Sequence, residues 1–242
     1  MPGSSTSGLD GQRVVVIGGT MGMGFATAAA AAAAGAGVVI ASRSQENVDK
    51  ALAELPDGVE GHPLDASDEA AVRSFFDRIG DFDHLVFTAG EHIVFTPFAE
   101  LTTEQARAWF DNRYWMAYTA AKHAAGHLRP HGSITFTSGI APVRPAPGVL
   151  VQAVAAGAIE TLTRALAVEL GPIRVNTVRV GPLERSLHDD PQRAELFKAI
   201  TAKIPARRFG SWDEVGAAYL YLMQSGYTTG TVLQLEGGYV LV

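Results

Sequence analysis

The segment between Arg13 and Ile40 constrains the fold more than any other part of the chain. A short β-branched run, Arg13–Ile17, leads directly into a loop that carries four glycines, and the alanine-rich segment Phe25–Ala34 follows it. Another β-branched run starts at Val38. A strand, a glycine loop, a helix and a second strand in this order predict the start of a parallel sheet.

The same alternation of strand and helix patterns continues along the chain. Later strands are predicted at residues 59–64, 84–88, 133–137, 173–178 and 232–235. Helices are predicted at residues 48–55, 68–79, from 102 or 103 to about 128, 149–170 and 212–224, and Ser67 is the predicted N-cap of the second. Seven strands alternating with helices predict an α/β fold, a Rossmann-type doubly wound seven-stranded parallel sheet flanked by helices.

The domain organisation is predicted to be simple. Residues 1–10 resemble a flexible tail, and no Pro/Gly/Ser-rich linker divides residues 11–242, so we expect a single domain there. Residues 183–209 interrupt the alternation with mixed charges and two prolines. We interpret this segment as a substrate-side insertion over the carboxyl edge of the sheet, where such folds bind ligands.

Composition argues against several classes of protein. The chain has no cysteine, which excludes disulfides, thiolate metal sites and a cysteine nucleophile. Its formal net charge is −6 with scattered basic residues, so neither nucleic acid nor an anionic membrane is an expected partner. The start lacks the apolar core of a signal peptide, and a cytoplasmic protein is expected.

His188, Asp189 and Asp190 make a poor preformed ligand set, so no metal site is predicted.

The glycine loop has the pattern of a phosphate-binding turn. Glycines after a strand and at the start of a helix let backbone N–H groups approach a pyrophosphate, which the positive end of the helix dipole favours. The residues predicted to contact a nucleotide here are Gly18, Thr20, Met21, Gly22, Met23 and Gly24. The alternative is a tight turn that binds nothing, but the strand–loop–helix context favours a nucleotide.

The end of the second strand indicates which nucleotide is bound. A cofactor with a free ribose 2′-OH usually meets an acid at this point, but here the chain has Ser42 and Arg43. Both can hold a 2′-phosphate through charge-assisted hydrogen bonds, which favours NADP(H) over NAD(H). The alternative is that Arg43 is an ordinary solvated charge. Asp65 follows the third strand, where its carboxylate can accept a hydrogen bond from an adenine amine or cap the next helix.

These residues, together with several later ones, resemble the short-chain dehydrogenase/reductase family. The resemblance runs from about Gly11 to the carboxyl terminus. The later matching segments are Thr88–Gly90, Asp111–Asn112, Ile173–Asn176, Gly181–Pro182, Thr229–Gly230 and Glu236–Gly238. The resemblance implies a nicotinamide cofactor near Ala89, Gly90 and Gly181, a small-molecule substrate, and a homotetramer or homodimer.

The catalytic residues of that family are missing. No tyrosine lies between Tyr118 and Tyr219, and no lysine lies between Lys122 and Lys198. In the family, a Tyr in this region moves the proton during hydride transfer, and a Lys lowers the pKa of that Tyr. Simple ketone reduction is therefore expected to be inefficient in this chain.

Other residues occupy the catalytic positions. Counting back from the helix end at 166–170 places Gln152 at the Tyr position, Ala156 at the Lys position and Gly139, beside Ser138, at the serine position. A glutamine amide forms hydrogen bonds but gives up no proton at neutral pH. Asn112 matches the helical asparagine of the catalytic group.

Four residues are therefore the candidates for catalysis: Asn112, Ser138, Gln152 and His92. His92 follows the Thr88–Gly90 turn and is a candidate replacement proton donor, because histidine titrates near neutral pH. The alternative for His92 is a solvent-exposed loop position. Arg144 and Arg185 flank the predicted pocket and are candidates for binding a substrate carboxylate or phosphate, although solvated loop arginines are commoner.

The sequence favours one function and leaves two alternatives. The favoured function is an NADP(H)-dependent oxidoreductase with a non-standard active site, which moves hydride to or from a carbonyl, an imine or an activated alkene. The first alternative is a redox-inactive nucleotide-binding or scaffold subunit. The second is a non-redox lyase or cyclase that reuses the pocket.

Overall fold

The computed structural model describes residues 8–90, 95–184 and 201–242. Packed structure is present before the predicted domain start at residue 11. Leu9 is fully buried, and its N–H donates to the carbonyl of Ala34 at 2.7 Å. Residues 8–10 are therefore part of the folded domain, whereas residues 1–7, 91–94 and 185–200 lie outside the described part of the chain.

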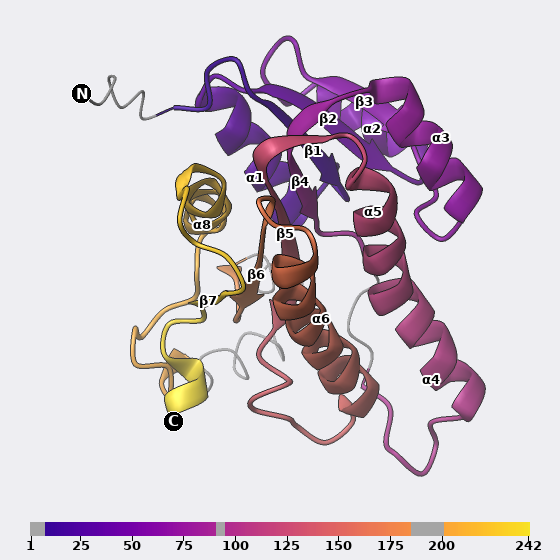
Figure 1. Cartoon of the computed structure of the whole chain (residues 1–242). Helices are drawn as coiled ribbons and strands as arrows, with labels where there is room; N and C mark the ends of the chain where they lie inside the picture. Colours follow the sequence, from indigo (N-terminus) through magenta and orange to yellow (C-terminus); the bar gives the residue numbers. More distant parts are fainter. Residues whose placement is uncertain (1–7, 91–94, 185–200) are drawn as a thin grey trace.

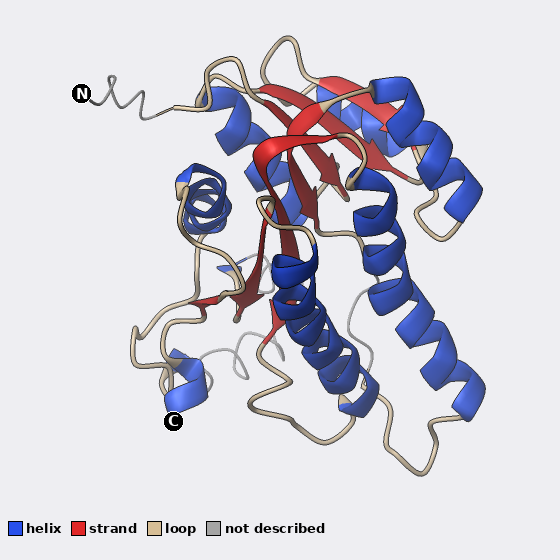
Figure 2. Cartoon of the chain, in the orientation of Figure 1, coloured by secondary structure: helices blue, strands red, loops and turns tan. Residues whose placement is uncertain are grey.

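The centre of the molecule is a seven-stranded sheet in which every neighbouring pair is parallel (Figures 1 and 2). The strand order is β3-β2-β1-β4-β5-β6-β7. The strands are β1 Arg13–Ile17, β2 Gly37–Ser42, β3 Glu60–Pro63, β4 Phe82–Phe87, β5 Leu128–Gly139, β6 Arg174–Val180 and β7 Val232–Leu235. This is the predicted doubly wound sheet, and β1 and β4 lie where the order of connection reverses.

Helices cover both faces of the sheet. They are α1 Gly22–Ala33, α2 Gln45–Leu52, α3 Glu69–Ile79, α4 Thr103–Phe110, α5 Met116–Ala124, α6 Leu150–Glu169 and α8 Trp212–Gln224, with a short 3-10 turn η3 at Tyr239–Leu241. One apolar core packs α3, α5 and α6 against the sheet, and a second packs α1 and α8 against the opposite face. Helix α6 is long and apolar enough to pass as a membrane span by length and composition, yet its buried side is part of the first core.

The N-cap of α3 differs from the prediction by one residue. The carboxylate of Asp68 accepts hydrogen bonds from the N–H groups of Ala70 at 2.9 Å and Ala71 at 3.2 Å, so Asp68 is the cap. The hydroxyl of Ser67 instead donates to Asp65 at 2.7 Å. An ionised carboxylate next to two helix N–H groups is the stronger partner for the helix dipole.

The long helix predicted from Thr102 to about residue 128 is interrupted. Thr102 forms a capping box with Gln105 and starts α4, as predicted. A π-helical turn, η1, then occupies Asp111–Trp115, and α5 ends at Ala124. Wider turns of this kind are frequent at functional sites. Here the turn contains the predicted catalytic residue Asn112.

Candidate active site

The glycine loop is built by close packing at the carboxyl end of β1. A Cβ atom added at Gly18 would lie 2.6 Å from the amide nitrogen of Ala89, and one added at Gly24 would lie 2.2 Å from the carbonyl oxygen of Gly18. Both distances are far below any real contact, so the two glycines are required for the loop to fold against the end of β4. The N–H groups of Thr88 and Ala89 hold this arrangement by donating to the carbonyl of Ile17 at 2.9 and 3.1 Å.

The start of α1 is open toward a ligand. Met21 makes no side-chain cap at the start of α1 and no acid lies in its first turn, which is also true of α6, whereas α2, α3, α4 and α8 each begin with a side-chain cap. Gly22 has a φ of +54°, and a Cβ there would meet only Trp212, at 3.7 Å. The N–H groups of the first turn and the positive end of the helix dipole therefore fit a pyrophosphate.

The residues predicted to select the nucleotide lie at one corner of the sheet. Ser42 ends β2 and Arg43 is exposed beside it. The pKa of the Asp65 carboxyl is lowered mainly by hydrogen bonds from Ser67 and, more weakly, by the positive charge of Arg43. Arg43 and Asp65 thus face the same region. Asp65 does not cap α3, which leaves contact with an adenine amine as its predicted role.

The hydroxyl of Ser138, a predicted catalytic group, is bound by a buried side chain. Its hydroxyl donates to Oε1 of Glu160 at 2.6 Å. Glu160 also accepts from Nε and Nη2 of Arg179 at 2.9 and 2.7 Å. The exposed fractions are 7% for Ser138, 6% for Glu160 and 8% for Arg179. The three side chains form a closed polar network between β5, α6 and β6.

Glu160 and Arg179 were not predicted to belong to a site, although both carry a signal in the sequence. Glu160 is an acid in the apolar centre of a helix, and Arg179 is a base in a strand of which every residue is buried. Charged residues at such positions are almost always paired. The strand register, in which Ser138 is the partner of Arg179, could not be read from the spacing of these residues.

The remaining candidates divide into those inside and outside the described chain. Asn112 lies in η1 and Gln152 in the first turn of α6, and both are partly buried. His92, Arg185 and the residues His188–Asp190 lie outside the described residues. Arg144 is a correction: its guanidinium donates to the carbonyl of Tyr239 and lies 4.8 Å from the centre of that ring. It secures the carboxyl terminus and does not point to a substrate.

Arg113, which no sequence pattern singled out, reaches the same edge of the sheet. A Cβ atom added at Gly90 would lie 2.5 Å from Nη1 of Arg113, 2.6 Å from Cζ and 2.7 Å from Nε. Because three atoms of the guanidinium plane are almost equidistant from that point, the plane lies face-on against Gly90. Gly90 follows β4, so a positive charge covers the end of this strand.

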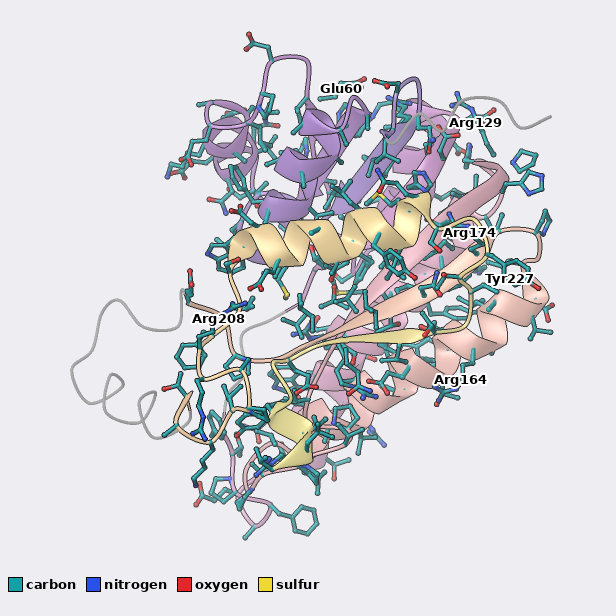
Figure 3. The ribbon with its side chains drawn as sticks, turned by 90° about the vertical axis from the view of Figure 1, so that its left-hand side faces the viewer. Glu60, Arg129, Arg164, Arg174, Arg208 and Tyr227 are labelled. Carbon is teal, nitrogen blue, oxygen red and sulfur yellow. The ribbon has the colours of Figure 1, made fainter. Side chains whose placement is uncertain are left out.

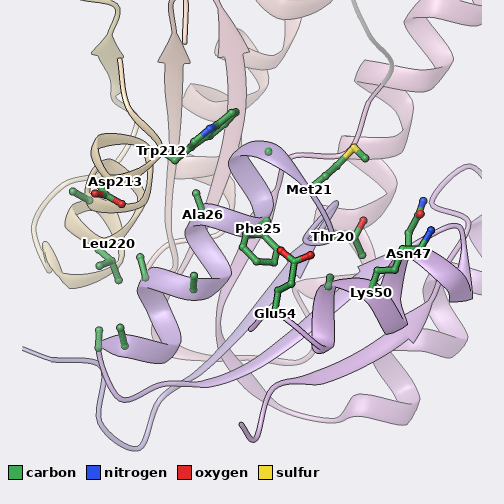
Figure 4. Close-up of a pocket in the computed structure, with 17 residues that line it drawn as sticks. Thr20, Met21, Phe25, Ala26, Asn47, Lys50, Glu54, Trp212, Asp213 and Leu220 are labelled. Atoms are coloured by element: carbon green, nitrogen blue, oxygen red, sulfur yellow. The ribbon is translucent and has the colours of Figure 1, made fainter. Parts of the chain in front are cut away.

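A groove of about 880 Å³ runs along the outer side of α1 (Figure 4). Thr20, Met21 and Gly22 line one end of it, and alanines of α1 with residues of α2 and α8 line the rest. The groove therefore touches the glycine loop, but most of its wall is the alanine face of α1.

Comparison with known proteins identifies the family. Residues 18–240 match the family described as Enoyl-(Acyl carrier protein) reductase. The chain is 34% identical to a short-chain dehydrogenase/reductase of Stachybotrys chlorohalonatus over 95% of this chain and 97% of that protein. It is also 34% identical to the L-xylulose reductase of Mus musculus, over 96% and 98% of the two chains. The chain belongs to the short-chain dehydrogenase/reductase family.

Solved structures of the family share the whole fold. A small-chain dehydrogenase in complex with NADPH superposes with a TM-score of 0.79 at 31% identity and covers 96% of this chain and 100% of its own. The MalC Reductase/Diels-Alderase of Malbranchea aurantiaca superposes with a TM-score of 0.90, also at 31% identity, over 98% of this chain and 99% of its own. The predicted family and the predicted Rossmann-type fold are both confirmed.

Proposed function

We propose that this member of the family is an NADP(H)-dependent oxidoreductase that works without the tyrosine–lysine pair. One observation carries the proposal: the start of α1 has no side-chain cap and no acid in its first turn, which suits a pyrophosphate. The family resemblance assigns Gln152 and Ala156, on α6, to the positions of the missing tyrosine and lysine. A relative of known structure that holds NADPH supports the choice of nicotinamide cofactor. The substrate is a small organic molecule.

The chain has residues for each part of such a cofactor. The N–H groups around Gly22 would hold the pyrophosphate, Ser42 and Arg43 the 2′-phosphate, and Asp65 the adenine amine. Ala89, Gly90 and Gly181 are the proposed neighbours of the nicotinamide end. Once bound, the cofactor supplies or accepts a hydride, and the rest of the chemistry depends on the protein side chains around it.

The missing acid restricts the substrate. Gln152 can orient a substrate oxygen or nitrogen through its amide, but it cannot protonate that atom. General acid–base catalysis contributes roughly 10²–10⁴-fold in rate, so a plain ketone is a poor substrate. An iminium ion, which already carries its proton, and an activated alkene, which can take a proton from water, avoid this loss. Asn112 is the proposed second orienting amide.

A second candidate function is catalysis of a cyclisation in the same pocket. One related structure carries the description Reductase/Diels-Alderase, so one fold of this family combines both activities. A cycloaddition needs binding and orientation but no enzymic acid, which suits the residues at positions 152 and 156. A redox-inactive nucleotide-binding subunit remains the third candidate, and hydride transfer in a single turnover would exclude it.

The test of the proposed function starts with cofactor selectivity. Arg43→Ala should raise the Kd for NADPH about tenfold or more and leave the Kd for NADH nearly unchanged, because a charge-assisted hydrogen bond contributes roughly 1.5–3 kcal/mol. Arg73→Ala, which removes an exposed arginine from α3, is the matched control and should change neither value. Isothermal titration calorimetry measures both constants. Absence of binding of either nucleotide to the wild-type protein would refute the proposal.

A further inference from the structure

The carboxyl-terminal turn η3 is held by a residue from a distant part of the sequence. Arg144 lies on the loop between β5 and α6, and its guanidinium donates to the carbonyl of Tyr239. The central carbon of the guanidinium lies 4.8 Å from the centre of the Tyr239 ring, and both residues are partly buried. One arginine thus makes a charge-assisted hydrogen bond and a cation–π contact with a single residue. Together these contacts fix both the backbone and the ring of Tyr239.

The segment that leads into η3 is bound on two other sides. A Cβ atom added at Gly181, which follows β6, would lie 2.7 Å from Cα of Glu236. The carbonyl of Gly237 accepts a hydrogen bond from the N–H of Ala206 at 3.0 Å. The carboxylate of Glu236 accepts from the N–H of Val240 at 3.0 Å, which closes the turn. The carboxyl-terminal turn therefore joins the end of β6 to the segment that precedes α8.

The loop that carries Arg144 leads directly into α6. The N–H of Arg144 donates to the carbonyl of Ile140, just after β5, at 2.9 Å, so this residue lies in a closed turn. Helix α6 begins six residues later, at Leu150, and Gln152 lies in its first turn. Figure 1 shows the carboxyl terminus beyond the ends of β6 and β7, at the same end of the molecule as the start of α6. A movement of η3 is therefore transmitted to the start of α6 through a short loop.

We propose that Arg144 is a positioning residue, which fixes the start of α6, with Gln152, relative to the turn at Gly181, beside which the nicotinamide is proposed to bind. This inference rests on the proposed function and adds a residue to its machinery. The contacts run from the loop before α6 through Arg144 to Tyr239, and from the carboxyl-terminal turn through Glu236 to Gly181. Arg144 itself touches neither substrate nor cofactor in this proposal.

The residues assigned to the catalytic positions make the placement of α6 important. Ala156 has no side-chain group that could bind a cofactor, so the position of the helix depends on its contacts with the rest of the protein. The polar network around Glu160 fixes the middle of α6, eight residues after Gln152, whereas Arg144 fixes the loop before its start. Gln152 can only orient a substrate, and a shift of about 1 Å in such a group can cost roughly 10²-fold in rate.

The kinetic test uses two probe substrates, 2-cyclohexenone and N-methyl-3,4-dihydroisoquinolinium, and follows the one that wild-type protein reduces faster with NADPH. Arg144→Met should lower kcat by roughly ten- to a hundredfold. The isotope effect measured with NADPH deuterated at C4 should rise, because hydride transfer then limits the rate. The Kd for NADPH should stay within about twofold, since Ser42, Arg43 and the glycine loop remain intact. Mere destabilisation would lower the active fraction without changing the isotope effect.

Four further variants control the interpretation. Arg144→Lys keeps the charge and should recover part of kcat, but an ammonium cannot donate to the carbonyl and also lie flat on the ring. Tyr239→Phe keeps both the carbonyl and the ring and should match the wild type. Arg144→Met/Tyr239→Ala should lose no more than Arg144→Met alone, because both changes break one contact. Arg164→Met makes the same chemical change at an exposed position of α6, where the guanidinium donates to Thr161, and should match the wild type.

The second test needs neither turnover nor cofactor, which separates a failure of this inference from a failure of the proposed function. Amide hydrogen exchange of the free protein is measured peptide by peptide. Arg144→Met should speed exchange in residues 140–153 and 236–242 and leave β1 and β2 unchanged. A chain that ends at Gly238 lacks the carboxyl-terminal turn and should show the same faster exchange in residues 140–153.

Three outcomes would overturn the inference. They are equal kcat values for wild type and Arg144→Met, an equally large loss of kcat in Arg164→Met, and unchanged exchange in residues 140–153 when Arg144 or residues 239–242 are removed. If wild-type protein binds NADPH and reduces neither probe, the proposed oxidoreductase fails instead. The exchange measurement alone then decides whether Arg144 couples the carboxyl-terminal turn to the start of α6.

Discussion

At the scale of a single residue, the burial of His84 limits the pH range over which the protein is stable. Its side chain is buried in β4, with Nδ1 2.8 Å from the hydroxyl of Ser133 and Nε2 2.6 Å from Oε1 of Gln12. Burial is the main cause that lowers the pKa of His84 to about 4, and the charge of Arg174 adds to it. The imidazole is therefore neutral in the folded protein at neutral pH.

We predict that the protein loses stability in mild acid because of His84. The unfolded chain binds a proton at His84 near its ordinary pKa of about 6.5, whereas the folded chain does so only near 4. The free energy of unfolding should fall between these two pH values, by an amount on the order of 3 kcal/mol from this group. Urea unfolding curves at about pH 7 and about pH 5 should show roughly 2 kcal/mol of this loss, because the titration is not complete at pH 5. His84→Gln should be less stable than wild type at neutral pH. If the free energy of unfolding of this variant falls as much in acid as that of wild type, His84 is not the cause of the loss.

The Ser138–Glu160–Arg179 network acts at the scale of secondary-structure elements. Glu160 lies on α6, and its two partners lie on the adjacent strands β5 and β6. Glu160 lies four residues after Ala156 and eight after Gln152, so all three follow one side of the helix. The network therefore sets the position of the helix that carries the non-standard catalytic residues.

Breaking the network is predicted to destabilise the protein strongly. Arg179→Met leaves the buried carboxylate of Glu160 without its cation and should lower the free energy of unfolding by about 3–5 kcal/mol. The double variant Arg179→Met/Glu160→Leu should regain much of this loss, because no buried charge remains. Arg208→Met, which breaks the exposed pair with Glu214, is the control and should have a much smaller effect. A loss in the double variant equal to the sum of the single losses would argue against direct coupling.

Most elements of the fold, but only part of the site, were predictable from the sequence. Each strand and helix carries its own periodicity, and the glycine loop has a fixed spacing, so both could be located along the chain. The π turn at Asp111–Trp115 was missed because one wider turn hardly changes the spacing of the apolar residues along a helix. The contact of Arg113 with Gly90 was missed because it joins a helix to a strand end through tertiary packing alone.

At the scale of the whole molecule, apolar side chains remain exposed on three adjacent elements. Trp115 and Tyr118, on η1 and α5, are 50% and 37% exposed, and Leu150 and Val154, on α6, are 46% and 55% exposed. Helix α6 packs beside η1, and Figure 1 shows it running alongside α4 and α5. We infer that two copies of the chain pair through this surface.

Light scattering on purified protein should therefore give the mass of a dimer or a tetramer. Val154→Glu places a charge in the inferred interface and should shift the mass toward the monomer. Tyr227→Glu is the control, because Tyr227 is fully exposed on the loop between α8 and β7 (Figure 3) and should leave the mass unchanged. A monomeric wild type, or identical masses for all three proteins, would refute this interface.

Trp212 begins α8, and its ring faces the open side of Gly22 at the entrance to α1. A nucleotide seated on that turn must pass close to the indole and change its surroundings. Trp212 is consequently an intrinsic fluorescent probe of the proposed phosphate-binding turn. In a variant that carries Trp109→Phe and Trp115→Phe and keeps Trp212, quenching of the ultraviolet emission would report occupancy in solution without any label or any knowledge of the substrate.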